Sequence, residues 1–597
     1  MIMAKTGILR PRTSKEAHDL MKVALGEEKA DLVIVNADVV NVYTGEILKD
    51  RSISVKGKWI AYVGRNARES IGPQTEVIDA RGQTVIPGLI EGHTHIAWLY
   101  TVYEFLKHVL PGGTTTIVTE TFEVYPVSGY DGVIDFLESL KDQPIKIFGT
   151  APVMISTSQA ARGIPPETLE KLLVRDDVLG LGESYWQAVL QDSERILPLF
   201  EQTLTANKTL EGHSAGAGDK KLAAYVGCGI SSCHEPINAE QVLERLRLGL
   251  HIMVREGSIR RDLEEISKIK DTGIDLRRLI LSTDGVEPED LIEKGYMEFV
   301  LQKAIDCGFD PVAAIQMATL NVAEHFSLDA LIGGIAPGRF ADMVIIPDVH
   351  TIKARMVVSN GRVIAREGEL LTAPRKHKYT TESLHSVKLS RDIIPTDFGI
   401  STNKSTDTVK VRLINMVTDL VTAESEVRWP VTDGQLRPDV NQDVVKVAAI
   451  DRTHNPGKIF SGLIKGFGLK SGAMACSAAW DTTDIIVVGA NDADMAWAVN
   501  RIHALQGGAV VCEKGDILAE LHLPVFGIMS DLPIEDIARR LQEIKKAAAN
   551  LGVRHPDPLL TLITLTGAAI PYLRICEEGL VNLKDGKTLP LFTRVVS

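Results

Sequence analysis

Eight short apolar runs, separated by helix-like stretches, fill the middle of the chain from about residue 88 to residue 330. They are LIEGHTHI, TTTIVTE, KIFGTAPVM, VLGLGES, KTLEGHS, GISSCHE, LHIMVRE and LILSTDG. Alternation of strand-like and helix-like segments is typical of a parallel α/β domain, and eight units predict a (β/α)8 barrel of the TIM type. Active sites of such barrels lie at the C-terminal ends of the strands, so the polar residues that end these runs are candidates for a site.

Shorter β-type segments flank this middle region on both sides. ADLVIVNADVVNVYTGE, SISVKGKWIAYVG and TEVIDARGQTVIPG precede it, and FADMVIIPD and ARMVVSNGRVIAREG follow it. The Asn360-Gly361 pair between two apolar runs is a strong signal for a β-hairpin. We therefore expect the two flanks to pair into one small β-sandwich.

The sequence divides into five expected segments. They are an N-terminal helical segment at 1–29, the first part of the sandwich at 30–87, the barrel at 88–334, the second part of the sandwich with a linker at 335–400, and a C-terminal α/β domain at 401–597. The N-terminal helix is expected to begin with a Ser14 cap. In the last segment, strand-like KVAAIDRTH and GAVVCEKGDILAEL accompany the helical stretch LPIEDIARRLQEIKKAAANLG.

Charge and composition exclude several classes of function. The formal net charge of -13 argues against a nucleic-acid partner, which would need a clustered basic face. We find neither an apolar run approaching the roughly 18 residues of a membrane span nor a secretory signal pattern. Six dispersed cysteines do not make a disulfide framework. We expect a cytoplasmic protein, a homodimer or higher homo-oligomer on base rates, that acts on a small molecule.

Two histidines with one residue between them, His93 and His95, end the first predicted strand. Residues i and i+2 of a strand point to the same face, so both imidazoles can bind one metal ion. An isolated pair of this kind is more often structural. However, four further polar residues end later strands of the barrel: Glu183, His213, His234 and Asp284. Four imidazoles and two carboxylates are enough for two divalent metals bridged by a carboxylate.

The HTH, GHS, CHE and STDG elements on successive strands resemble the amidohydrolase superfamily. More narrowly, GISSCHEPINAEQVLERLRLGLHIMVREGS, MATLNVAEHF and GGIAPGRFADMVI resemble the adenine deaminase family, as does the C-terminal AIDRTHNPGKIFSGLIKGFGLKSGAMACS. The resemblance extends from about Asp31 to the end of the chain. It implies a metal-dependent hydrolase that converts adenine and water to hypoxanthine and ammonia, with Glu183 as the bridging ligand in place of a carboxylated lysine.

The resemblance also implies a specific role for each of the six residues. His93 and His95 would hold one metal, His213 and His234 the other, and Glu183 would bridge them. Asp284 would act as general base toward a metal-bound hydroxide and return the proton to the leaving group. Mn or Fe is the favoured metal, with Zn as an alternative. The N/O ligand set itself accepts all three.

Three segments depart from the family pattern, at Ala97, Phe122 and Trp480. At each of these positions this chain has an apolar residue where the family has an acidic residue or a histidine. The metal ligands are retained, so hydrolysis is expected, while recognition of a polar purine edge should be weaker. The alternative function is hydrolysis of another amino-heterocycle or a cyclic amide, and a non-catalytic scaffold is a further one.

A carboxylic acid is also needed to protonate a ring nitrogen during attack on an aromatic ring. Glu120 and Glu123 follow the second predicted strand, and Glu256 follows the seventh. Each of the three is a candidate for this role in the substrate pocket. For any one of them, an ordinary loop carboxylate or an ion-pair partner is the competing interpretation, with Arg255 as a counter-ion of Glu256.

Overall fold

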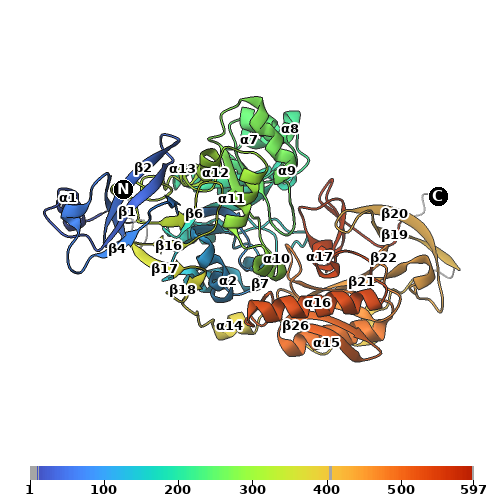
Figure 1. Cartoon of the computed structure of the whole chain (residues 1–597). Helices are drawn as coiled ribbons and strands as arrows, with labels where there is room; N and C mark the ends of the chain where they lie inside the picture. Colours follow the sequence, from blue (N-terminus) through green and yellow to red (C-terminus); the bar gives the residue numbers. More distant parts are fainter. Residues whose placement is uncertain (1–9, 11, 403–406, 594–597) are drawn as a thin grey trace.

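The computed structural model describes residues 10, 12–402 and 407–593. Figure 1 shows the N-terminal strands at one end of the molecule, the α/β barrel in the middle and the C-terminal domain at the other end. Among the described residues, no helix is both long and apolar enough to cross a membrane.

Eight parallel strands form the barrel, and each of the eight predicted runs contains one of them. They are β6 (Leu89–Thr94), β8 (Thr114–Thr119), β9 (Lys146–Ala151), β10 (Val178–Tyr185), β11 (Thr209–His213), β12 (Ser232–Cys233), β13 (His251–Arg255) and β14 (Leu279–Ser282). β6, β8, β9, β10 and β11 pair in one sheet and β12, β13 and β14 in another. Two backbone hydrogen bonds join the sheets, Ser231 N–H to Leu210 O at 2.9 Å and Asp284 N–H to His93 O at 3.1 Å. The prediction of a TIM-type barrel is confirmed.

Helices follow most of the strands and cover the barrel. They are α2 (Val102–Val109), α3 (Tyr125–Leu140), α4 (Pro166–Leu173), α5 (Trp186–Gln191), α6 (Ser193–Thr205), α7 (Asp219–Val226), α8 (Ala239–Arg247), α9 (Leu263–Ile266), α10 (Pro288–Glu293), α11 (Met297–Asp306), α12 (Pro311–Met317) and α13 (Leu320–His325). Ile90, Phe148 and Ile280 from the strands pack in one buried cluster with Val322 of α13. These apolar side chains form a packed core, while the polar candidate residues lie at the C-terminal ends of the strands.

Strands from both flanks of the barrel join in one nine-stranded sheet. Its members are β1 (Leu32–Asn41), β2 (Glu46–Lys56), β3 (Trp59–Gly64), β4 (Glu76–Asp79), β5 (Thr84–Pro87), β15 (Met343–Ile346), β16 (Met356–Ser359), β17 (Arg362–Arg366) and β18 (Glu369–Leu370). The link between the flanks is the antiparallel pair β5–β15, in which Met343 lies opposite Pro87. The expected hairpin is present, with positive φ at both Asn360 and Gly361.

Helix α1 (Ser14–Ala24) precedes this sheet. Its N-cap is Thr13, whose hydroxyl accepts a hydrogen bond from the backbone of Glu16, while the Glu16 carboxylate accepts one from Thr13 N–H. The prediction that Ser14 is the cap is therefore wrong by one residue. The Thr13–Glu16 pair is a capping box, which satisfies two free backbone donors at once.

The C-terminal domain is α/β, as predicted. Its main sheet contains β19 (Thr408–Met416), β20 (Thr422–Pro430), β21 (Val444–Asp451), β22 (Ile459–Lys465), β23 (Ala473–Cys476), β24 (Asp484–Gly489), β25 (Gly508–Glu513) and β26 (Asp516–His522). Its strand order is β20-β19-β22-β21-β24-β23-β25-β26. The helices are α15 (Asp492–Leu505), α16 (Ile534–Asn550) and α17 (Pro558–Ile563), and a small sheet adds β28 (Leu573–Cys576), β29 (Gly579–Asn582) and β30 (Lys587–Leu589). A short helix, α14 (Thr381–Leu384), precedes the domain.

Direct contacts hold this domain against the barrel. A two-residue strand after β6, β7 (Leu99–Tyr100), pairs in parallel with β27 (Met529–Ser530) of the C-terminal domain. The Ser158 hydroxyl, after β9, donates to the Glu577 carboxylate at 2.9 Å. α16 lies beside α10 of the barrel. These contacts place the C-terminal domain next to the barrel end that carries the polar side chains.

Candidate active site

The six predicted ligands lie at or just beyond the C-terminal ends of five barrel strands. His93 and His95 come from β6, Glu183 from β10, His213 from β11, His234 from the residue after β12 and Asp284 from the loop after β14. Five of these side chains are buried and His95 is half-buried. The structure therefore brings together residues that are up to 191 positions apart in the chain.

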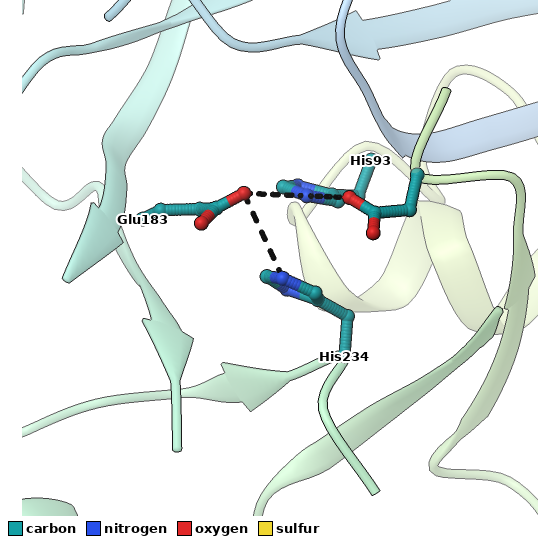
Figure 2. A group of neighbouring side chains, drawn as sticks. His93, Glu183 and His234 are labelled. Carbon is teal, nitrogen blue, oxygen red and sulfur yellow. Dashed lines mark hydrogen bonds and ion pairs between the residues drawn. The ribbon is translucent and has the colours of Figure 1, made fainter. Parts of the chain in front are cut away.

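Glu183 lies at the centre of the group. Its Oε1 is 3.2 Å from Nε2 of His93, 3.1 Å from Nε2 of His95 and 3.6 Å from Nε2 of His234. Figure 2 shows the Glu183 carboxylate pointing at the rings of His93 and His234. Three ring nitrogens thus converge on one oxygen that has about two lone-pair positions for hydrogen bonds.

Asp284 completes this side of the group. Its Oδ1 is 3.1 Å from Nε2 of both His93 and His95. Burial alone would raise the pKa of Asp284, but His234 and His93 around it, with Arg255, hold that pKa well below its usual range. The residue has a φ of 59°, in the left-handed region that non-glycine residues rarely adopt. Asp284 is therefore ionised at neutral pH and fixed in an uncommon backbone conformation.

A seventh residue, Glu235, belongs to the group and was missed from the sequence. Its Oε1 lies 3.3 Å from Nε2 of His213 and 3.4 Å from Nε2 of His234. Ligand atoms fall into two overlapping sets, His93, Glu183, His234 and Asp284 in one and His213, His234 and Glu235 in the other. The available signal was the CHE motif itself, in which Glu235 directly follows His234.

These residues fit a divalent metal centre. All donor atoms are imidazole nitrogens or carboxylate oxygens, which Mn, Fe and Zn accept. Within each set, the atoms lie within 4.8 Å of one another and are largely buried. The convergence of three Nε2 atoms on Glu183 Oε1 exceeds what hydrogen bonding can satisfy, and positive ions between the rings and the carboxylates would satisfy it.

Two of the three pocket carboxylates expected from the sequence lie behind the first pair of histidines. Glu123 Oε1 is 2.5 Å from Nδ1 of His95, and Glu120 Oε1 is 3.6 Å from Nδ1 of His93. Thr150 donates a further hydrogen bond to Glu120 at 2.6 Å. Carboxylates in this position fix the orientation and tautomer of a metal-binding histidine. Glu123 also lines the cavity over the ligand group, whereas Glu120 does not.

The third expected carboxylate, Glu256, points elsewhere. It is buried and forms a 2.6 Å ion pair with Lys303 of α11, outside the cavity lining. The interpretation of Arg255 as the counter-ion of Glu256 is wrong. Arg255 instead contacts Glu235, and its guanidinium donates to Asp284 Oδ2 at 3.0 Å. Adjacent residues on a strand point to opposite faces, which explains why Arg255 enters the site and Glu256 leaves it.

The cavity over the ligand group has a volume of about 260 Å³. One wall comes from the barrel and includes His95, Glu183 and Asp284. The other comes from the C-terminal domain and includes Trp480 and Ile528. The lining atoms are mainly apolar, as is usual for sites that bind small molecules.

Comparison with known proteins identifies the family. The amidohydrolase family model matches residues 84–364, and the model of the adenine deaminase C-terminal domain matches residues 419–587. An adenine deaminase of Moorella thermoacetica is 38% identical over 584 residues, 96% of this chain and 98% of that protein. One from Clostridium botulinum (strain 657 / Type Ba4) is 34% identical over 96% of this chain and 97% of its own length. This chain belongs to the adenine deaminase family.

A solved structure of molinate hydrolase is also similar, with 18% identity and a TM-score of 0.45 over 56% of this chain and 95% of that chain.

In this member of the adenine deaminase family, all three divergent positions lie in the cavity wall. Ala97, Phe122 and Trp480 are part of the lining. The Phe122 ring lies edge-on to His95, with 5.5 Å between ring centroids, and Trp480 lies edge-on to Trp98 at 6.2 Å. These three side chains make this part of the cavity wall apolar.

Proposed function

We propose that this chain hydrolyses adenine to hypoxanthine and ammonia with two divalent metal ions as cofactors. The observation that carries the proposal is the convergence of His93, His95 and His234 on the Glu183 carboxylate in the wall of the cavity. Full-length similarity to curated adenine deaminases supports the choice of substrate.

We assign the ligands as the sequence predicted, with His93 and His95 on one ion, His213 and His234 on the other and Glu183 between them. Glu235 is a further candidate ligand on the His213 side, since its Oε1 faces both rings. Mn or Fe is the favoured metal, with Zn as an alternative. When bound, such ions lower the pKa of water and so supply a nucleophile near neutral pH.

Asp284 is the proposed general base. Its carboxylate is ionised and buried beside His93 and His95. It can therefore take a proton from water and pass it to the departing amino group. The hydrogen bond from Arg255 to Oδ2 leaves Oδ1 directed at the ligand group. Arg255 thus orients the base, and in the same way it anchors Glu235.

Glu123 is the one carboxyl of the three proposed proton donors that lines the cavity. Its short contact with Nδ1 of His95 gives it a second role, orienting that ligand. Glu120 has the orienting role toward His93, because it lies behind the ring and outside the lining. Glu256, paired with Lys303, has no role in the proposed reaction.

Ammonia release from metal-loaded enzyme tests this function directly. We expect adenine to be the best substrate in a panel of purines, amino-pyrimidines, hydantoins and lactams. The apolar positions Ala97, Phe122 and Trp480 favour the second candidate, another amino-heterocycle or a cyclic amide. Ring opening of a lactam or hydantoin without turnover of any purine would establish that candidate instead.

We also propose that the enzyme works in the cytoplasm as a homodimer or higher homo-oligomer. All six cysteines are free thiols in the structure, which is typical of a reducing compartment. Closed homo-oligomers are the commonest assembly of chains like this one.

A further inference from the structure

One carboxyl group of the cavity wall comes from the C-terminal domain. Asp481 lies in the loop between β23 and β24, is 5% exposed and lines the cavity. Its Oδ1 accepts a hydrogen bond from the Tyr185 hydroxyl at 3.2 Å, and its Oδ2 accepts one from the backbone N–H of Ala568 at 2.7 Å. Asp481 is thus held from both sides, by the barrel and by its own domain.

The surroundings fix the direction of this carboxyl group. Asp481 has a φ of 60°, in the left-handed region. The preceding residue, Trp480, is fixed by a 2.7 Å hydrogen bond from the Thr566 hydroxyl to its carbonyl oxygen. Strained, well-supported backbone of this kind is common at functional sites.

Tyr185 connects Asp481 to the metal ligands. It lies two residues after Glu183 on β10, and its ring packs edge-on against His213 with 4.8 Å between centroids. The ligands on the barrel and Asp481 on the C-terminal domain line the same cavity, so a flat heterocycle bound in it can meet both. Its reacting carbon would lie toward the ligands and its far edge toward Asp481.

The other charged groups of the cavity wall already have ionic partners. Glu123 faces His95, Glu235 faces Arg255, and Arg260 donates to Asp262 at 3.1 Å. The partners of Asp481 are a phenol and a backbone amide, both neutral. Burial, with the negative charge of Glu183, raises the pKa of Asp481 to about 7. A carboxyl group that is partly protonated near neutral pH can both donate and accept hydrogen bonds.

We propose that Asp481 is a specificity-determining residue that binds the N3–N9 edge of the purine, the edge remote from the attacked C6 amino group. The inference rests on the proposed function and adds a contact to it. N9–H donates to one carboxyl oxygen, and the carboxyl O–H donates to N3, so that one group satisfies two neighbouring ring atoms. The apolar residues Ala97, Phe122 and Trp480 then cover the ring faces and edges without competing for these hydrogen bonds.

The test compares adenine with 9-methyladenine, which lacks N9–H, on metal-loaded wild-type enzyme and on Asp481→Ala and Asp481→Asn. Leaving a buried hydrogen-bonding group unpaired typically reduces kcat/KM about 10- to 100-fold. We expect wild-type enzyme to prefer adenine by about that factor. Asp481→Ala should lose the same factor on adenine, mainly through KM, and should treat the two substrates within about threefold of each other.

Asp481→Asn should restore most of the preference, because an amide also carries one donor and one acceptor. The matched control is Asp516→Asn, the same change at an exposed residue of the C-terminal domain. Equal losses on both substrates in Asp481→Ala, with the preference intact, would show a purely structural role and overturn the inference. An unchanged kcat/KM for adenine in Asp481→Ala would also overturn the inference.

Calorimetric binding of adenine separates this inference from the proposed function. Turnover of adenine by wild-type enzyme tests the function alone. If wild-type enzyme binds adenine without turning it over, and Asp481→Ala loses that binding at unchanged metal content, the proposed function fails and the Asp481 contact stands. Equal adenine affinity in the two proteins overturns the contact.

Discussion

Glu123 lies 2.5 Å from Nδ1 of His95, which leaves Nε2 of the same ring to face Glu183 and Asp284. Glu120 has the corresponding position behind His93. Both carboxylates come from the segment after β8, where Phe122 interrupts the family pattern. In this segment Phe122 lines the cavity together with Glu123, while Glu120 and Glu123 contact the two histidines proposed as metal ligands.

Purified protein should contain close to two divalent metal ions per chain. The expectation rests on the two overlapping sets of ligand atoms that share His234. Glu183→Gln should lower metal content, because it removes the carboxylate common to three imidazoles. Elemental analysis after metal-supplemented expression measures both proteins, with the exposed Glu170→Gln as control. Wild-type protein without tightly held transition metal would falsify this assignment.

Glu123→Gln should weaken metal binding while leaving the ligands in place. Loss of a carboxylate behind a metal-binding histidine typically costs about 10- to 100-fold in metal affinity or activity. Competition with a chelator measures the affinity. Glu256→Gln is the contrasting variant, since Glu256 pairs with Lys303 away from the site. It should lower the melting temperature with little change in metal affinity. Equal affinity losses in the two variants would contradict the orienting role of Glu123.

Asp284→Asn should keep the fold and most of the metal while losing most turnover. Removal of a positioned general base typically costs about 10²- to 10⁴-fold. Steady-state kcat for adenine, measured beside metal content on the same preparation, gives the comparison. Turnover near the wild-type value at full metal loading would show that another residue moves the proton.

The sequence predicted the barrel because strand–helix alternation and strand-end polarity are both local patterns. The six candidate ligands were predicted for the same reason, since they lie at or just beyond the ends of five of these strands. Asp481 could not be placed by such reasoning, because its position depends on how the C-terminal domain docks against Tyr185 of the barrel. Likewise, Arg255 ends β13 and Glu256 directly follows it. Their partners depend on the side to which each side chain points.

The contact between the barrel and the C-terminal domain also contains a half-buried pair of carboxyl groups. Glu287, the N-cap of α10, lies beside Asp557, the N-cap of α17. Burial and the nearby Asp557 raise the pKa of Glu287 to about 8. A glutamate in an unfolded chain has a pKa of about 4.3. Between these two values the folded protein binds more protons than the unfolded chain, so this group makes stability fall as pH rises from about 4 to about 8.

Glu287→Gln should therefore stabilise the enzyme in alkaline solution. The group remains neutral in the variant, so the difference in unfolding free energy between variant and wild type should grow by about 2 kcal/mol from pH 6 to pH 8.5. Urea denaturation at the two pH values measures this difference. Glu293→Gln, at an exposed position of the same helix, is the control and should show no such pH dependence. A constant difference between Glu287→Gln and wild type across this range would mean that Glu287 is already ionised at pH 6 in the folded protein.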